Sequence, residues 1–92
     1  MIRAFRCPET KAVFEGRGSR KFRNIESAAK RRLDILHAAV SLTGLAAIRS
    51  NHLEALRGNR KGQHSIRIND QFRICFRWVD RDAYDVEIVD YH

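Results

Sequence analysis

Three proton-handling side chains stand next to one another at the end of the sequence. Asp90, Tyr91 and His92 supply a carboxyl group, a phenol and an imidazole within one short stretch. Groups of these types exchange protons with a substrate in general acid–base catalysis. A frayed tail without function is the alternative interpretation, because chain ends are commonly disordered. The sequence leaves both interpretations open.

Arginines on two expected strands form the second group of candidate residues. Apolar positions between Phe72 and Trp78 alternate with Arg73 and Arg77, so an inward aromatic face places both arginines on the opposite face. Arg67 takes the equivalent position on the preceding strand. The turn before that strand adds Arg57, Arg60 and Lys61. We therefore expect a cationic sheet face on which several arginines can converge on one phosphate group.

The net charge of +7 gives this cationic face a functional interpretation. A strong positive charge favours a polyanionic partner, either a nucleic acid or an acidic protein. The face could instead be a solvated surface, or its arginines could pair with Asp85, Glu87 and Asp90 of the last expected strand. The overall charge favours the first interpretation, and the sequence does not exclude the second.

The histidines and cysteines were tested for the spacing of a metal site. None of the usual ligand patterns is present among His37, His52, His64, His92, Cys7 and Cys75, so we expect no metal site. His64 begins a strand beside basic residues and is a candidate for RNA contact or an ordinary surface histidine. The two distant cysteines are typical of free thiols in a reducing compartment, which favours the cytoplasm.

The first half of the chain is expected to contain a strand and two helices. Residues 2–5 form an extended opening that ends before a proline, and a brief helix follows around residues 12–14. Apolar residues at helical spacing then predict the main helix, which begins at Asn24 as the capping residue and continues to Val40. Gly44 is expected just beyond its last turn.

The second half of the chain changes to the two-residue period of strands, over residues 65–69, 72–78 and 84–90. We predict an α+β fold in which an N-terminal strand and two helices pack on a small, mainly antiparallel sheet of four to five strands. The 92 residues, 43% of them hydrophobic, suffice for one core, so residues 1–92 are expected to form a single domain. The sequence offers no signal peptide and no membrane span.

Several segments together resemble HigB-type toxins of the RelE superfamily, over the whole chain and most specifically from Leu56 onward. They are Leu56-Arg57-Gly58-Asn59-Arg60-Lys61-Gly62, Ser65-Ile66, Phe72-Arg73-Ile74 and Glu87-Ile88-Val89-Asp90-Tyr91-His92. The resemblance implies a RelE-like fold and an endoribonuclease that cuts mRNA in the ribosomal A site. It also implies a cognate helix-turn-helix antitoxin, similar to HigA, through which alone the toxin would reach operator DNA.

The resemblance also implies roles for individual residues. Arg57 matches a position that is usually basic, Arg73 matches a phosphate-binding arginine, and Asp90-Tyr91-His92 matches the catalytic end of the family. Three residues before Arg57, some relatives have a histidine, whereas this chain has Glu54 and an offset His52. The roles of Glu54 and His52 therefore stay open.

These residues suit a metal-independent cleavage by attack of the RNA 2′-hydroxyl group. That reaction needs a base, an acid and cations that stabilise the phosphorane. We assign the cations to Arg57 and Arg73, acid–base or orienting roles to Asp90 and His92, and a nucleotide contact to Tyr91. Further RNA contacts are expected from Arg60, Lys61, His64, Arg67 and Arg77.

The alternative to a nuclease is a non-catalytic basic module that binds RNA, DNA or an acidic protein. In that case the C-terminal triplet would be incidental. A component that binds operator DNA directly ranks last, because the second half of the chain has no pair of helices resembling a recognition motif.

Overall fold

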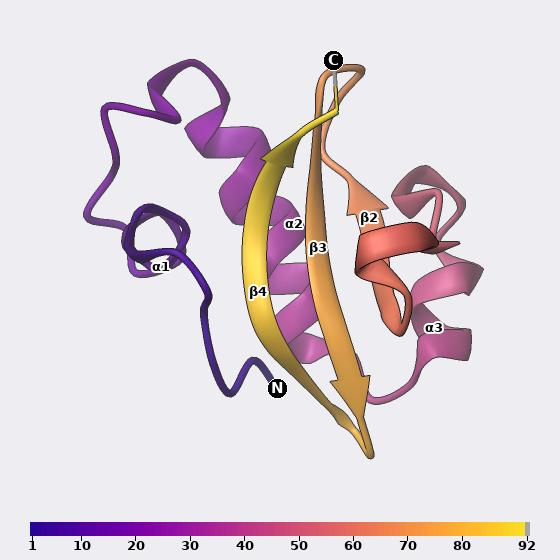
Figure 1. The fold of residues 1–92 in the computed structure, drawn as a ribbon. Helices are drawn as coiled ribbons and strands as arrows, with labels where there is room; N and C mark the ends of the chain where they lie inside the picture. Colours follow the sequence, from indigo (N-terminus) through magenta and orange to yellow (C-terminus); the bar gives the residue numbers. More distant parts are fainter. Residues whose placement is uncertain (92) are drawn as a thin grey trace.

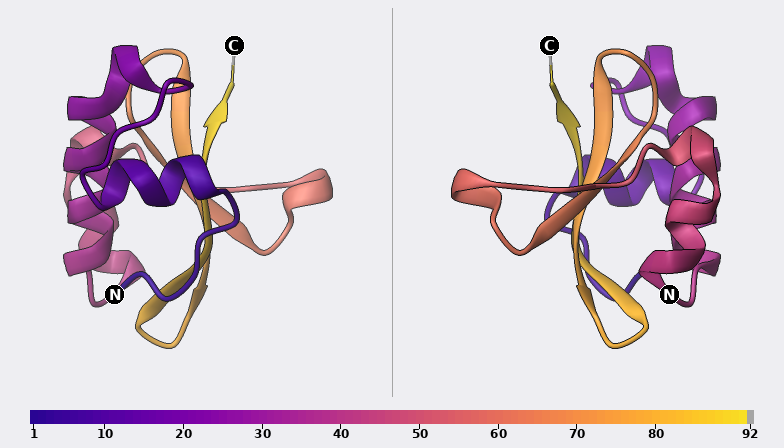
Figure 2. Two further views of the ribbon diagram at one scale, coloured as in Figure 1. Left: turned by 90° about the vertical axis from the view of Figure 1, so that its left-hand side faces the viewer. Right: turned by 90° about the vertical axis from the view of Figure 1, so that its right-hand side faces the viewer.

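The computed structural model describes residues 1–91 as a sheet with helices on one face. Figure 1 shows α2 behind the sheet, and the edge-on views of Figure 2 place the helices on one side of it. The predicted α+β class is confirmed. In chain order the elements are α1 (Pro8–Phe14), η1 (Arg23–Ile25), α2 (Glu26–Ala38), α3 (Leu42–Ala47), η2 (Arg49–Asn51), β1 (Glu54–Ala55), η3 (Gly58–Arg60), β2 (Gln63–Arg67), β3 (Phe72–Val79) and β4 (Asp82–Asp90).

The sheet has the order β1-β2-β3-β4, with every neighbouring pair antiparallel. The N-terminal segment lies parallel to β4 through isolated bridges from Ile2 to Ala83 and from Phe5 to Val86. The expected N-terminal strand is therefore present as two bridges at this edge. On the other side, the connection from β1 through η3 to β2 projects away from the helices (Figure 2). We call residues 54–63 the arm.

The helical segment differs from the prediction at both ends. The main helix starts at Glu26, and its N-cap is Ile25, without a side-chain cap, so the predicted capping by Asn24 is wrong. The chain leaves the helix at Ala39, and Ser41 then accepts a hydrogen bond from the Gly44 amide (2.9 Å). This serine cap starts α3, a third helix that the sequence analysis missed because Gly44 was interpreted as a stop signal.

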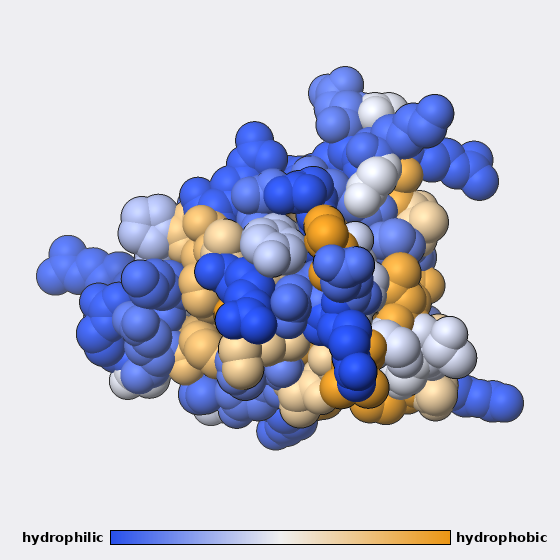
Figure 3. All heavy atoms as spheres, turned by 90° about the horizontal axis from the view of Figure 1, so that it is seen from below, coloured by the Kyte–Doolittle hydropathy of each residue, from blue (hydrophilic) through white to orange (hydrophobic). Residues whose placement is uncertain are grey.

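The core lies between α2 and the inner face of the sheet. Leu33 and Leu36 of α2 are fully buried, as are Ile74 and Phe76 of β3 and Val86 of β4. Burial of each such side chain stabilises the fold by about 1.5–3 kcal/mol. Seen from below, the surface is mostly hydrophilic, with apolar side chains in small groups (Figure 3). The apolar content of the chain is thus largely used to fix the helices on one sheet face.

A β-bulge in β4 determines which residues reach the outer face of the sheet, the face without helices. Cys75 pairs with Glu87, but Arg77 pairs with Tyr84, so β4 has one extra residue between these pairs. Asp85 absorbs it with a left-handed φ of 53°. Simple alternation would put Tyr84 and Val86 on one face. The bulge separates them, because Val86 is buried whereas the Arg77 guanidinium lies over the Tyr84 ring at 5.6 Å.

Arg73 lies on the outer face as predicted, but it is buried rather than open to solvent. Its Nε donates to Ser65 Oγ at 2.7 Å, and its Nη2 donates to the main-chain carbonyl of His52. Its Nη1 also lies 3.5 Å from Glu54 Oε1. Arg73 is covered because the segment leading into β1 folds over this end of β3.

We expect Thr10→Val to lower the free energy of unfolding by about 1–3 kcal/mol. The fully buried Thr10 hydroxyl accepts the Ile88 amide at 3.0 Å, which satisfies an edge donor of β4. Valine has the same shape and cannot accept that bond. The measurement is urea unfolding beside Thr43→Val, whose threonine is exposed on α3. Equal midpoints for the two variants would contradict this role.

We also expect Arg73→Ala to destabilise the fold by about 1–3 kcal/mol, because it leaves Ser65 and the His52 carbonyl without their donor. The matched control is Arg67→Ala, whose arginine pairs across the strands with Arg73 and forms an ion pair with the exposed Asp70. This control should cost less than about 1 kcal/mol. A smaller loss for Arg73→Ala than for Arg67→Ala in urea unfolding would refute the anchoring role.

Candidate functional site

An open pocket of about 620 Å³ lies where the arm meets the end of β4. It joins two regions that are far apart in the sequence, the stretch around Arg57 and the C-terminal Tyr91. Its lining residues are Glu54, Ala55, Leu56, Arg57, Arg60 and Tyr91. Two arginines, a carboxylate and a phenol thus line one cavity on the outer side of the sheet.

The arm holds its arginines through a short hairpin. Glu54 and Ala55 pair with β2, and the Leu56 amide donates to the Gln63 carbonyl at 2.9 Å. Gly58 then takes a φ of 63°, a conformation that glycine adopts without strain, and the chain enters the single turn η3. This turn brings Arg60 back over the outer face, while Arg57 remains at the entrance of the hairpin.

Arg57 and Arg60 contribute differently to the pocket. Arg57 is exposed, and within residues 1–91 it has no hydrogen bond or ion pair from its guanidinium. Arg60 Nη1 donates to Glu87 Oε1 at 2.8 Å and to Gln63 Oε1 at 3.0 Å. The bond to Glu87 raises the pKa of Arg60 further above its usual value. Arg57 is therefore a cation left unpaired by residues 1–91 and open to a ligand, whereas Arg60 is held in place by hydrogen bonds.

Tyr91 forms the C-terminal wall of the pocket and is 46% exposed. Its amide donates to the Gln71 carbonyl at 2.7 Å, and its hydroxyl lies 3.8 Å from the Cys75 sulfur. Partial burial and the contact with Cys75 raise the pKa of the Tyr91 phenol, and burial raises the pKa of the Cys75 thiol. Both groups therefore stay protonated at neutral pH.

Glu54 supplies the carboxylate of the pocket, and its side chain is 57% exposed. Arg73 lies behind it, so the buried guanidinium supports the pocket from below instead of lining it. His52 takes a left-handed φ of 44° and contributes its carbonyl to Arg73. Because β1 has only two residues, the sequence carried no strand signal that could have placed Glu54 here.

The C-terminal candidates do not all point to this pocket. Asp90 pairs with Phe72, one position before Tyr91, and its Oδ2 accepts a hydrogen bond from Gln71 Nε2 at 3.0 Å. Neighbouring residues of a strand alternate between faces, so Asp90 is directed to the other side from Tyr91. Asp90 is not among the residues that line the pocket. His92 lies outside the described residues.

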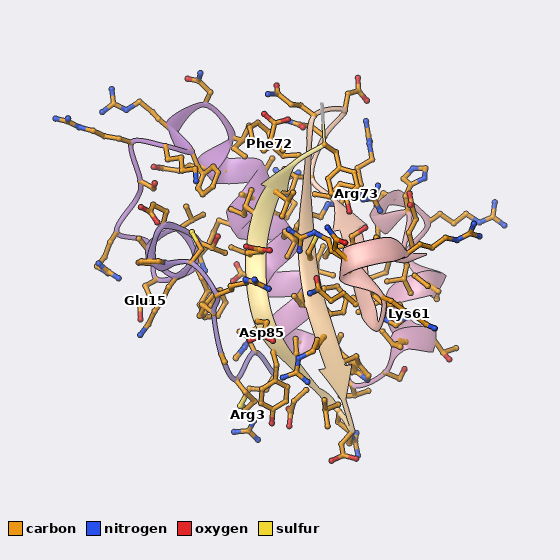
Figure 4. The ribbon with its side chains drawn as sticks, in the orientation of Figure 1. Arg3, Glu15, Lys61, Phe72, Arg73 and Asp85 are labelled. Carbon is orange, nitrogen blue, oxygen red and sulfur yellow. The ribbon has the colours of Figure 1, made fainter. Side chains whose placement is uncertain are left out.

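The remaining candidates for RNA contact lie outside the pocket lining. His64 is half-buried and stacks on the core residue Phe76, with ring centroids 6.2 Å apart, so it faces the helix side. Arg77 pairs with Asp85 at 2.8 Å. In Figure 4, Lys61 and Arg73 lie on opposite sides of η3. Arg67 forms an ion pair with the exposed Asp70.

Among residues 1–91, no group of three or more histidine, cysteine, aspartate or glutamate side chains is placed to hold a metal ion. None of the helices in this range is long and apolar enough to cross a membrane.

Solved structures of similar fold come from a bacterial toxin–antitoxin pair. The chain is similar to a chain of the heterotetrameric YoeB–YefM toxin–antitoxin complex from Staphylococcus aureus, with a TM-score of 0.59, 17% identity and coverage of 100% of this chain and 98% of that one. It is also similar to the YoeB dimer from Staphylococcus aureus, with a TM-score of 0.56, 17% identity and coverage of 99% and 97%. These likenesses establish the fold.

Sequence comparisons establish the family. The chain is 47% identical over 57 residues to Toxin HigB-1 from Vibrio cholerae serotype O1, a match that covers 62% of this chain and 60% of that relative. The chain thus matches about three-fifths of the relative's length. The model of the HigB-like toxin family, described as the RelE-like toxin of the type II toxin–antitoxin system HigB, matches residues 8–92. The chain therefore belongs to the RelE-like HigB toxins of type II toxin–antitoxin systems.

Proposed function

We propose that this toxin is an endoribonuclease that cleaves mRNA on the ribosome without a metal ion, by attack of a 2′-hydroxyl group on the adjacent phosphate. The observation that carries the proposal is the pocket in which Arg57, Arg60, Glu54 and Tyr91 meet. An RNA phosphate carries negative charge that increases in the phosphorane, and two guanidinium groups suit that charge. Family membership supports the same activity.

The side chains of the pocket have distinct parts in this mechanism. Glu54 is the carboxylate that lines the pocket together with the two arginines, so we assign it the removal of the 2′-hydroxyl proton. Arg57 and Arg60 stabilise the phosphorane, and Arg73 Nη1 lies behind the pocket, 3.5 Å from Glu54 Oε1. Tyr91, whose phenol stays protonated, stacks on a base or donates a hydrogen bond.

The proton for the 5′-oxygen leaving group is assigned to the C-terminal end, where Asp90 and His92 remain the proposed acid and orienting groups. The products are a 2′,3′-cyclic phosphate and a 5′-hydroxyl end. Asp90 alternates away from Tyr91 and does not line the pocket, so we propose that it acts on the reaction through a neighbouring group rather than by contact with RNA. Arg67 and Arg77 are proposed as outer contacts with the RNA backbone, given their place on the same sheet face.

The proposed partners follow from the family. We propose a cognate helix-turn-helix antitoxin, similar to HigA, that inhibits the toxin, and contact with operator DNA only through that complex. The proposed place of action is the cytoplasm, where translating ribosomes and mRNA are present. The net charge of +7 favours encounter with both, since ribosomes and mRNA are polyanionic.

Arg57→Gln is expected to reduce cleavage roughly 100-fold, because one cation that stabilises the transition state is lost from the pocket. The fold should be unaffected, since the Arg57 guanidinium has no protein partner within residues 1–91. The measurement is the rate at which new 5′ ends appear in mRNA on translating ribosomes, mapped by primer extension.

The matched control for this experiment is Arg81→Gln, which removes the same charge from an exposed turn at the other end of the sheet. It should cleave near the wild-type rate. Equal losses in both variants would indicate an effect of overall charge and argue against a phosphate site at Arg57. RNA binding by the wild-type chain without any cleavage would favour the non-catalytic binding module.

A further inference from the structure

Glu87 lies on the outer face of β4 between two arginines that are far apart in the sequence. Its Oε1 accepts the hydrogen bond from Arg60 Nη1 at 2.8 Å, and its Oε2 lies 4.0 Å from Arg6 Nε. Arg6 belongs to the N-terminal segment, whose amide at this residue donates to the Val86 carbonyl at 3.0 Å. The side chain of Glu87 is only 17% exposed. The carboxylate is thus held on both sides.

We propose that Glu87 is a positioning residue for cleavage, which acts by fixing the guanidinium of Arg60 in the pocket. The inference rests on the proposed nuclease function. It assigns no contact with RNA to Glu87, which is absent from the pocket lining.

The hydrogen bonds of Arg60 support the proposed positioning role of Glu87. A guanidinium has five N–H donors in a rigid plane, so fixing one edge fixes the direction of the others. Nη1 is engaged by Glu87 and Gln63, whereas Nε and Nη2 donate no hydrogen bond within residues 1–91. The donors that remain belong to a residue that lines the pocket. They are therefore presented in one orientation to an incoming phosphate.

The bulge at Asp85 is what makes this contact possible. The extra residue shifts the alternation of β4, so that Val86 points into the core and Glu87, the next residue, points to the outer face. Gln63, which pairs with Arg77 across the strands, closes the other side of Nη1. The register of the strands, the bulge in β4 and the arm all help to place the Arg60 guanidinium. An ion pair formed by chance on the surface would not depend on all three features.

A positioning role and a merely stabilising role predict different kinetics. Removing the carboxylate adds net positive charge, so RNA binding should not weaken. Loss of the fixed orientation should instead slow the step after binding, because misplaced catalytic groups reduce the rate even when affinity is kept. A merely stabilising ion pair would lower the unfolding midpoint and leave the rate of the folded protein unchanged.

The test compares Glu87→Gln with Asp82→Asn in the full chain. Asp82 is on the same strand, its side chain is 21% exposed, and it pairs with Arg3 at 3.2 Å, so the control makes the same charge change in a similar setting away from the pocket. The probe is an mRNA on stalled ribosomes whose cut site has been mapped with the wild type. Binding is measured on the same mRNA with a 2′-deoxy nucleotide at that site.

We expect Glu87→Gln to slow single-turnover cleavage roughly 10- to 100-fold with undiminished binding, and Asp82→Asn to cleave near the wild-type rate. In an Arg60→Ala background, Glu87→Gln should cause no further loss, because its effect passes through Arg60. Urea midpoints are measured for every variant.

Three results would overturn the inference while leaving the nuclease proposal intact. They are an unchanged rate in Glu87→Gln, an equal loss in Asp82→Asn, and a full additional loss when Glu87→Gln is combined with Arg60→Ala. Failure of the wild-type chain to cut any mRNA would instead reject the nuclease proposal, and the positioning role with it.

Discussion

The hydrogen bonds of Arg73 are the interaction on which the outer half of this molecule depends. One buried guanidinium joins the Ser65 hydroxyl on β2 to the His52 carbonyl before β1, and it lies 3.5 Å from Glu54. A two-residue strand such as β1 has too few ladder bonds to hold the arm by itself. The arginine supplies that attachment, so the position of the pocket follows from a polar contact rather than from the apolar core.

Two of the arginines on the outer face are paired with carboxylates of β4. Arg60 is paired with Glu87, and Arg77 is paired with Asp85, so much of the positive charge on this face is neutralised locally. The more exposed pair of Arg77 and Asp85 adds little stability, since solvent screens it. The effect of both pairs is to fix where positive charge remains available. Arg57 at the pocket keeps an uncompensated charge within the described residues, which concentrates the attraction for a phosphate at one place.

The core and the pocket are coupled through β4. Its bulge at Asp85 allows Val86 to be buried under the helices and Glu87 to face Arg60 in the next position. The same strand leads into Tyr91, whose amide donates to the Gln71 carbonyl in the turn between β2 and β3. In Figure 4, Asp85 is labelled beside β4 and Arg73 beside the upper part of β3. A change that shifted the register of β4 would therefore alter the core and the pocket together.

The sequence by itself determined the class of fold, the main helix, three strands and the family. The spacing of apolar residues and the order of short motifs are local signals, so they can be read without knowledge of the tertiary contacts. Local pattern also put Arg73 on the correct face, but it could not reveal its burial, because residues 21 positions earlier cover it. The bulge, the burial of Arg73 under the segment before β1, and the meeting of Arg57 with Tyr91 depend on strand register and on chain folding over the sheet. Only the tertiary structure decides those, since each of them depends on segments that are far apart in the sequence.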